Sequence, residues 1–270
     1  MLGFFNKIKN YNVFKKNKKS STLAGALVFF TVLGLVPTAY LLSVMFTLFG
    51  KELSIVTEVF SVKEFDEIKV FLLETVKKLS AGGNAIAGLI AVYSSANLFV
   101  HLKLTGEFIY NCKSSGGLTL RIFSIIGTII ISLVIVISII FYAFLSVYIN
   151  RALGKFLGLI INFSALFFIS LIAVTLINLF TCPYKIKIRE VFKGSLYTCV
   201  FSILFTLVFI VYVKFFASYG EIYGKIAVIP VFFGWLFIVM RCLVNGFIIN
   251  AYTLGIYKRK AKKVDFKLRI

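Results

Sequence analysis

Long stretches without a charged residue alternate along the chain with short segments that carry Lys and Arg. A bilayer core of about 30 Å needs roughly 20 helical residues at a rise of about 1.5 Å each. Windows of this length run from Ser20 to Gly50, Leu79 to Leu102, Ile122 to Asn150, Phe156 to Tyr184, Gly194 to Val213 and Ile226 to Tyr257, the last interrupted by Arg241. The pattern therefore predicts an all-α polytopic membrane protein with six transmembrane helices.

The predicted organisation is one transmembrane domain over residues 21–257 between two basic ends, residues 1–20 and 258–270. The expected spans cover residues 21–49, 82–103, 121–149, 155–181, 191–214 and 225–256. Most connections between them are short. Tyr148 to Lys155 is expected to form a tight outer hairpin, and Asn111 to Gly117 a flexible inner connection.

Composition supports a membrane protein and excludes other classes. The chain has 270 residues, of which 60% are apolar and 15% charged, and its mean hydropathy is +0.99. So little polar surface cannot cover a soluble globule, and it excludes a disulfide-rich secreted scaffold, a coiled coil and a disordered tail. The unbroken apolar run from Ile129 to Leu145 also lacks the alternation of a membrane β-barrel strand.

Basic residues are distributed unevenly between the two predicted membrane faces. The formal net charge is +20, which alone could suggest nucleic-acid binding. If the N-terminus is cytoplasmic, however, 20 of the 30 Lys and Arg residues fall on the inner side and 9 on the outer side. This asymmetry predicts that both termini are cytoplasmic. We expect the basic ends to contact anionic lipid headgroups and expect no nucleic-acid partner.

The segment between the first two predicted helices, residues 51–80, reads as an amphipathic helix on the outer side. Phe65, Ile68, Leu72, Val76 and Leu79 recur at spacings of three and four. Two interpretations stand: the segment caps the helix bundle or lies in the outer headgroup layer, or it forms a lid over a substrate opening.

The sequence offers no ligand set for a metal ion or cofactor. It has one His and four Cys. Cys112 and Cys182 fall in predicted cytoplasmic loops, while Cys199 and Cys242 lie within predicted spans, so we expect no disulfide. Neither CxxC nor Cys/His spacings occur, and we expect no metal and no cofactor.

Polar residues on the sixth predicted helix form the main candidate substrate contact. Pro230, Gly234, Arg241 and Asn245 share one helical face. A guanidinium in a span is costly, so Arg241 should bind an anionic headgroup or substrate, pair within the bundle, or extend to the inner interface. Pro230, like Pro37 on the first helix, frees a carbonyl and predicts a kink, either structural or substrate-lining.

A second polar stripe lies on the second predicted helix. Ser94 and Asn97 are candidate substrate contacts there. The structural alternative is that they form hydrogen bonds to a neighbouring helix. His101 stands at the predicted inner edge, where a solvated or helix-terminal role is more typical than proton transfer.

Three stretches resemble the YihY/BrkB family of bacterial inner-membrane proteins. They are AGALVFFTVLGLVP, YSSANLFVHLKLTGEFIY, and CPYKIKIREVFKGS with the later YGEIYGKIAVIPVFFGWLFIVMRCLVNGFIIN. Besides Pro37 and Ser94, the positions that fit the family pattern are Tyr110, Pro183, Gly194, Tyr223, Gly224, Trp235, Gly246 and Asn250. The chain departs from the pattern at Asn97, Glu107 and Ile248.

The resemblance implies six transmembrane helices, cytoplasmic termini and a place in the bacterial inner membrane. Some family members carry the older label ribonuclease BN. Metal-dependent hydrolysis of a phosphodiester needs clustered His and carboxylate ligands, which one His and three acidic residues on the cytoplasmic side do not provide. A nuclease is therefore not expected.

Two functions remain open. The favoured hypothesis is transport or flipping of a lipid or another amphiphile, which would use broken helices and polar stripes. The alternative is a non-transporting scaffold that maintains the cell envelope. We expect no enzymatic activity, because the sequence shows no Ser/His pair or convergent carboxylates at membrane depth.

Overall fold

The structure is a computed structural model that describes residues 2–48, 85–113, 117–184, 186–216, 228–256 and 262–263. The amphipathic segment predicted over residues 51–80 lies outside the described residues. Tyr223 and Gly224, which carry part of the family resemblance, also lie outside them.

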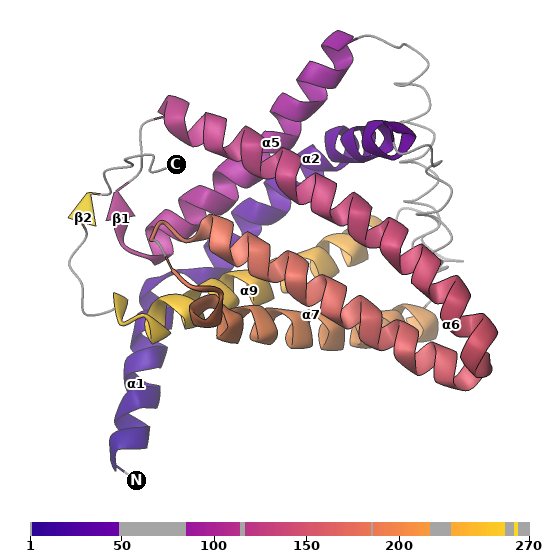
Figure 1. The fold of residues 1–270 in the computed structure, drawn as a ribbon. Coiled ribbons are helices and arrows are strands. Elements are labelled where there is room, and N and C mark those ends of the chain that lie inside the picture. The colour runs from indigo at the N-terminus through magenta and orange to yellow at the C-terminus, as the bar shows by residue number, and fades with distance from the viewer. Residues whose placement is uncertain are drawn as a thin grey trace. The chain divides into compact units, whose positions relative to one another are not determined.

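The described chain is helical apart from one pair of very short strands (Figure 1). The helices are α1 (Leu2–Asn17), α2 (Ser20–Leu48), α5 (Ala85–Ile109), α6 (Gly117–Thr181), α7 (Ile188–Phe216) and α9 (Val228–Thr253). Strands β1 (Cys112–Lys113) and β2 (Lys262–Lys263) pair in parallel. The connection after α5 and the basic C-terminal end are thereby joined.

Four helical segments in the described part are long and apolar enough to cross a membrane: Gly117–Tyr142, Ile161–Thr181, Ile188–Tyr212 and Pro230–Thr253. Ser20–Leu35 is a shorter apolar helix. Only 11% to 44% of the residues in the most apolar windows of these four segments are buried within the chain, so much of their apolar surface is available to lipid. A helical membrane protein is thus established, whereas the six spans and their orientation stay predictions.

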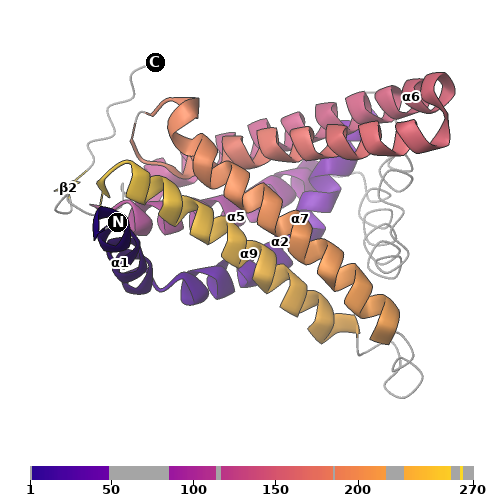
Figure 2. The same cartoon turned by 90° about the horizontal axis from the view of Figure 1, so that it is seen from below.

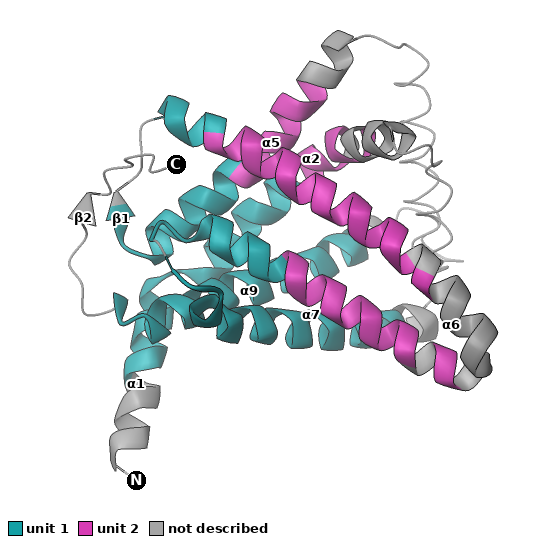
Figure 3. Cartoon of the chain, viewed as in Figure 1, with its two compact units in different colours: residues 1–31, 100–122, 174–270 teal, residues 32–99, 123–173 magenta. Residues whose placement is uncertain are grey.

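Helix α6 is assigned as one helix of 65 residues. If straight, it would be about 98 Å long, roughly three times the thickness of a bilayer core. Its arms, residues 123–142 and 161–173, instead run in opposite directions within one compact unit (Figures 1 and 3). The hairpin expected at Tyr148 to Lys155 lies between the arms, and the helical assignment continues through it.

The chain divides into two compact units (Figure 3). Residues 1–31, 100–122 and 174–270 form unit 1, and residues 32–99 and 123–173 form unit 2. Each unit joins segments that are far apart in the sequence.

Helices α7 and α9 run side by side in unit 1 (Figures 1 and 2). Gly194 on α7 and Gly246 on α9 allow the close approach. A Cβ built on Gly246 would lie 2.7 Å from the carbonyl oxygen of Gly194, and one built on Gly194 would collide with the carbonyl of Gly246. Small residues that bring two backbones together are typical of helix pairs in membranes.

The basic segment at the N-terminus forms helix α1, which the sequence patterns did not predict. Its aromatic side chains pack on the end of α9: the ring centroid of Tyr252 lies 5.4 Å from that of Tyr11 and 6.1 Å from that of Phe14. These contacts fix α1 against the remainder of unit 1.

Candidate functional site

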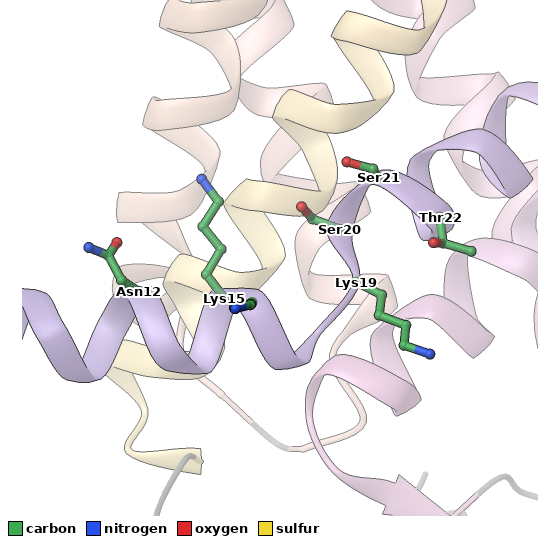
Figure 4. A pocket seen from close by; sticks show the side chains of 7 residues that line it. Asn12, Lys15, Lys19, Ser20, Ser21 and Thr22 are labelled. Carbon is green, nitrogen blue, oxygen red and sulfur yellow. The ribbon is translucent and has the colours of Figure 1, made fainter.

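A pocket of about 370 Å³ lies at the junction of α1 and α2. Figure 4 shows the polar and basic side chains at this junction. The pocket is lined by Asn12, Lys15, Lys16, Lys19, Ser20, Ser21 and Thr22. The lining residues carry three ammonium groups, three hydroxyls and one amide, a composition suited to an anion. The side chains of Lys15 and Lys19 extend in opposite directions from the junction (Figure 4).

The geometry of the junction begins with Lys19, whose φ of 45° lies in the left-handed region. This conformation costs a residue with a side chain about 1 to 2 kcal/mol and ends α1. The carbonyl of Lys19 then accepts hydrogen bonds from the amides of Thr22, at 3.0 Å, and Leu23, at 3.2 Å. Lys19 is thus the residue that caps α2. In the described part of the chain, the amides of Ser20 and Ser21 have no backbone acceptor.

Ser20 is the most deeply placed hydroxyl of the pocket. Its side chain is 8% exposed and lines the pocket. Within the described residues its hydroxyl makes no hydrogen bond to another group. Among the described residues, this hydroxyl oxygen is not one of the buried polar atoms that lack a partner, so water can hydrogen-bond to it.

Lys18 lies at the same junction but faces another part of unit 1. Its Nζ donates to the carbonyl oxygen of Phe108 at 2.8 Å and to Oδ1 of Asn111. The ammonium also lies 5.4 Å from the ring centroid of Phe14. Burial lowers the pKa of Lys18. Lys18 therefore binds the carboxyl-terminal end of α5 and does not line the pocket.

Lys103 on α5 makes an equivalent contact with the end of α6. It is 6% exposed, and its Nζ donates to the carbonyl oxygens of Phe180, at 2.9 Å, and Cys182, at 3.4 Å. Glu107, one helical turn later, is 2% exposed and interacts electrostatically with Lys103. A cation at a helix carboxyl terminus satisfies free carbonyls and opposes the helix dipole. Lys103 is therefore a cap of the carboxyl-terminal end of α6.

Buried amides connect three helices of unit 1. Oδ1 of Asn250 on α9 accepts from the backbone amide of Gly194 on α7 at 2.8 Å, and its Nδ2 donates to Oδ1 of Asn178 on α6 at 2.8 Å. Nδ2 of Asn178 in turn donates to the carbonyl oxygen of Val174 at 2.9 Å. Asn178 and Asn250 are both 0% exposed. This network gives Gly194 and Asn250 a structural role.

The other described positions of the family resemblance are also mostly structural. Tyr110 is fully buried beside Tyr184, whose hydroxyl donates to the carbonyl oxygen of Tyr110 at 3.3 Å. Nε1 of Trp235 donates to Oγ1 of Thr206 at 3.1 Å, which joins α9 to α7. Pro183 is half-buried just after the end of α6.

The residues predicted on the sixth helix lie on α9 in two environments. Pro230, Gly234 and Arg241 are exposed, whereas Asn245 is 7% exposed. The predicted common face of the helix is therefore exposed from Pro230 to Arg241 and buried at Asn245. Pro230 is the third residue of α9 as described, where a missing amide proton disrupts no helical hydrogen bond.

The candidates predicted on the second helix lie on α5. Ser94 and Asn97 are half-buried and belong to unit 2, as does Pro37, through which α2 continues without interruption. His101 belongs to unit 1, and its ring stacks on Phe30 with centroids 3.3 Å apart. His101 therefore packs against an apolar ring in unit 1.

The pocket was missed in the sequence, although its signal was present. Ser20, Ser21 and Thr22 follow a cluster of Lys residues directly at the start of an apolar window, and Ser and Thr are typical of helix amino termini. Among the described residues, no three His, Cys, Asp or Glu side chains are grouped as a metal site.

Comparisons with known proteins found relatives among bacterial membrane proteins. The chain is 34% identical over 105 residues to the UPF0761 membrane protein of Coxiella burnetii strain Dugway 5J108-111, and equally to that of strain RSA 493 / Nine Mile phase I. The matched region spans 38% of this chain and 36% of each relative, so only about a third of the relatives' length is covered. No solved structure matches the chain.

A family model covers much more of the sequence. The model described as virulence factor BrkB matches residues 13–266, a range that includes most of the pocket, both capping lysines and the amide network. This chain belongs to the virulence factor BrkB family of membrane proteins.

Proposed function

We propose that this protein moves or flips a lipid or another amphiphile across the membrane. The observation that carries the proposal is the basic, hydroxyl-lined pocket at the amino terminus of the apolar helix α2. An amphiphile has a polar headgroup and an apolar tail, and this junction offers a surface for each. We place the protein in the bacterial inner membrane, with six spans and both termini in the cytoplasm, as the charge asymmetry predicts.

Apolar surface near the pocket supports the proposal. On α2, Thr22, Ala26 and Phe29 are exposed at spacings of four and three and therefore lie on one face, beginning at a residue of the pocket. Phe29 is 58% exposed. An acyl chain whose headgroup lies in the pocket would extend along this face, over about 10 Å from Thr22 to Phe29.

Arg241 supplies a second site for an anionic headgroup in this proposal. It is exposed on α9, and a guanidinium can bind a phosphate with two parallel hydrogen bonds. Asn245, one turn further along α9, is buried, and its Oδ1 accepts no hydrogen bond from the described residues. We assign no catalytic role to either residue.

Reconstitution tests the proposal directly. Purified protein would be inserted into vesicles that carry a fluorescent phospholipid in both leaflets, and a membrane-impermeant reductant would be added outside. We expect the protein to make the inner-leaflet fluorophore accessible faster than in protein-free vesicles. A soluble dye enclosed in the same vesicles serves as the control for leakage.

A second function, that of a non-transporting envelope scaffold, is favoured by the buried amide network. Asn178 and Asn250 fix α6, α7 and α9 through hydrogen bonds that a moving interface would have to break. A scaffold would leave the fluorophore protected at the protein-free rate in sealed vesicles. That result, obtained with correctly folded protein, would replace the transport proposal by the scaffold.

A further inference from the structure

We infer that Arg241 on α9 and Tyr197 on α7 bind the phosphate of a phospholipid headgroup near the middle of the membrane. The inference rests on the proposed function. It adds the depth of the Arg241 site, the chemistry of its ligand and a second binding residue. Both residues belong to unit 1, in which α7 and α9 pack together (Figure 3).

Arg241 lies at the centre of an apolar helix. It is the twelfth of the 24 residues in the candidate span Pro230–Thr253, so about 17 Å of helix separates it from either end. Its side chain is exposed, and in a membrane a side chain at this depth faces lipid. A lone guanidinium there is costly, because Arg stays protonated. The charge of Arg241 therefore favours an anionic partner.

The described part of the chain offers no carboxylate that balances this charge. Its acidic residues are Glu107 and Glu190. Glu107 interacts with Lys103, and Glu190 accepts a hydrogen bond from the amide of Lys187 at 2.7 Å, at the exposed start of α7. Arg241 makes no hydrogen bond or ion pair with another described residue. An anionic ligand would supply the missing charge.

Tyr197 places a hydroxyl donor near this guanidinium. It is half-buried on α7 and interacts electrostatically with Arg241. The amide nitrogen of Asn245 donates a hydrogen bond to the Tyr197 hydroxyl, so the hydroxyl proton remains available to another acceptor. A phosphate held by two parallel hydrogen bonds from the guanidinium would accept this proton as well.

The depth of the site favours a lipid over free phosphate as the source of this group. Free phosphate would have to leave water entirely, which is costly for an ion. A phospholipid reaches the same depth with its acyl chains in hydrocarbon. Ile238, three residues before Arg241 and 39% exposed, supplies apolar surface on the same side of α9.

Tyrosines connect the site with the Thr253 end of α9, which is predicted to be cytoplasmic. Tyr11 of α1 interacts electrostatically with Tyr197. The ring of Tyr11 packs on Tyr252, with centroids 5.4 Å apart. Polar groups therefore follow one another from that end of the helix toward Arg241, and a headgroup would approach the site from this side.

Lipid binding by the full-length protein tests the inference. Native mass spectrometry would compare phosphatidylglycerol with diacylglycerol of identical acyl chains, which lacks the phosphate. We expect a preference for phosphatidylglycerol. Arg241→Leu should weaken its binding about tenfold or more, because a charged bidentate contact is lost. Tyr197→Phe should weaken it about fivefold, because one hydrogen bond is lost.

Photocrosslinking in vesicles locates the bound phosphate. A phosphatidylglycerol analogue with a diazirine on its headgroup would be reconstituted with the protein and irradiated. We expect crosslinks to the peptide that contains residue 241, and we expect Arg241→Leu to abolish them. Headgroup crosslinks confined to residues at the ends of the spans would overturn the site.

Two matched variants on α7 serve as controls. Tyr212→Phe removes an exposed hydroxyl at the other end of the helix, and Lys193→Gln removes an exposed cation. Both should leave the preference for phosphatidylglycerol unchanged. Circular dichroism and size-exclusion profiles would show that each variant is folded, and Tyr197→Phe keeps the test decisive where Arg241→Leu folds poorly.

Specific outcomes decide the inference and the source of the phosphate. Displacement of phosphatidylglycerol by inorganic phosphate would overturn the lipid as the source, whereas failure to compete would support it. An unchanged preference in Arg241→Leu, or a loss in Tyr212→Phe equal to that in Tyr197→Phe, would overturn the inference.

The outcome is separable from that of the transport assay. Phosphate-dependent binding without accelerated translocation would retain the site and reject transport. Accelerated translocation with no preference for phosphatidylglycerol over diacylglycerol would retain transport and reject the site.

Discussion

Gly246 is a single residue whose lack of a side chain sets the distance between two helices. A Cβ at this position would collide with Oγ1 of Thr198 and lie 2.7 Å from the carbonyl oxygen of Gly194. Gly234, on the same helix, has no atom within 4 Å of an added Cβ. The two glycines therefore differ in environment while they share a helix.

Gly246→Ala should lower the free energy of unfolding by about 1 to 3 kcal/mol, because α7 and α9 must separate to admit a methyl group. Gly234→Ala should be neutral or stabilise by up to about 1 kcal/mol, since Ala favours a helix. Thermal unfolding in detergent, followed by circular dichroism, measures both. Equal melting temperatures for the two variants would contradict the packing described for Gly246.

Arg241 is the residue whose predicted role most needs a functional assay. Arg241→Leu should insert and fold at normal yield, because it removes a charge from an apolar helix. It should lose most lipid translocation in the vesicle assay, and Arg241→Lys should keep part of it, since an ammonium forms no bidentate contact. If Leu lowers stability, Arg241 is a structural partner; if it changes neither property, Arg241 only extends to the headgroups.

At the scale of the elements, two buried lysines cap helices distant in sequence. Lys103→Met should leave the carbonyls of Phe180 and Cys182 without their charged donor and Glu107 without its nearby cation. We expect a loss of about 1 to 3 kcal/mol in the free energy of unfolding. Lys193→Met, at an exposed site, is the control and should change it by less than about 0.5 kcal/mol.

Hydrophobic patterning predicted most of the helices because a bilayer demands long apolar segments. The windows that begin at Ser20 and Ile122 coincide with α2 and the first arm of α6. Helix α1 was missed because half of its residues are Lys or Asn, a composition equally typical of a loop, and its packing depends on contacts with Tyr252. Local sequence does not reveal such contacts.

The site was less predictable than the fold. The individual polar residues could be identified in the sequence, but their environments could not. Asn250 is hydrogen-bonded to Gly194, 56 residues away in the sequence, and Lys103 to Phe180, 77 residues away. The pocket also depends on the left-handed φ of Lys19, a conformation uncommon for Lys. Only the structure shows that these residues are buried and which distant residues they contact.

For the whole molecule, topology is the prediction with the widest consequence. In a background without the four native Cys, Ser61→Cys and Ser218→Cys should react with a membrane-impermeant maleimide in intact cells, whereas Ser21→Cys and Ser115→Cys should react only after permeabilisation. The 20 to 9 distribution of basic residues is the reason. Labelling of Ser21→Cys in intact cells would place the pocket on the outer side.

The capping lysines also govern the order in which the protein can assemble during synthesis. Lys18 can form its hydrogen bonds only after Phe108 and Asn111 have been synthesised. Lys103 can form its own only after Phe180 and Cys182 have been synthesised. Until then each ammonium has to remain in contact with water, because burying it without its acceptors is costly. A nascent chain interrupted before Cys182 therefore cannot complete unit 1.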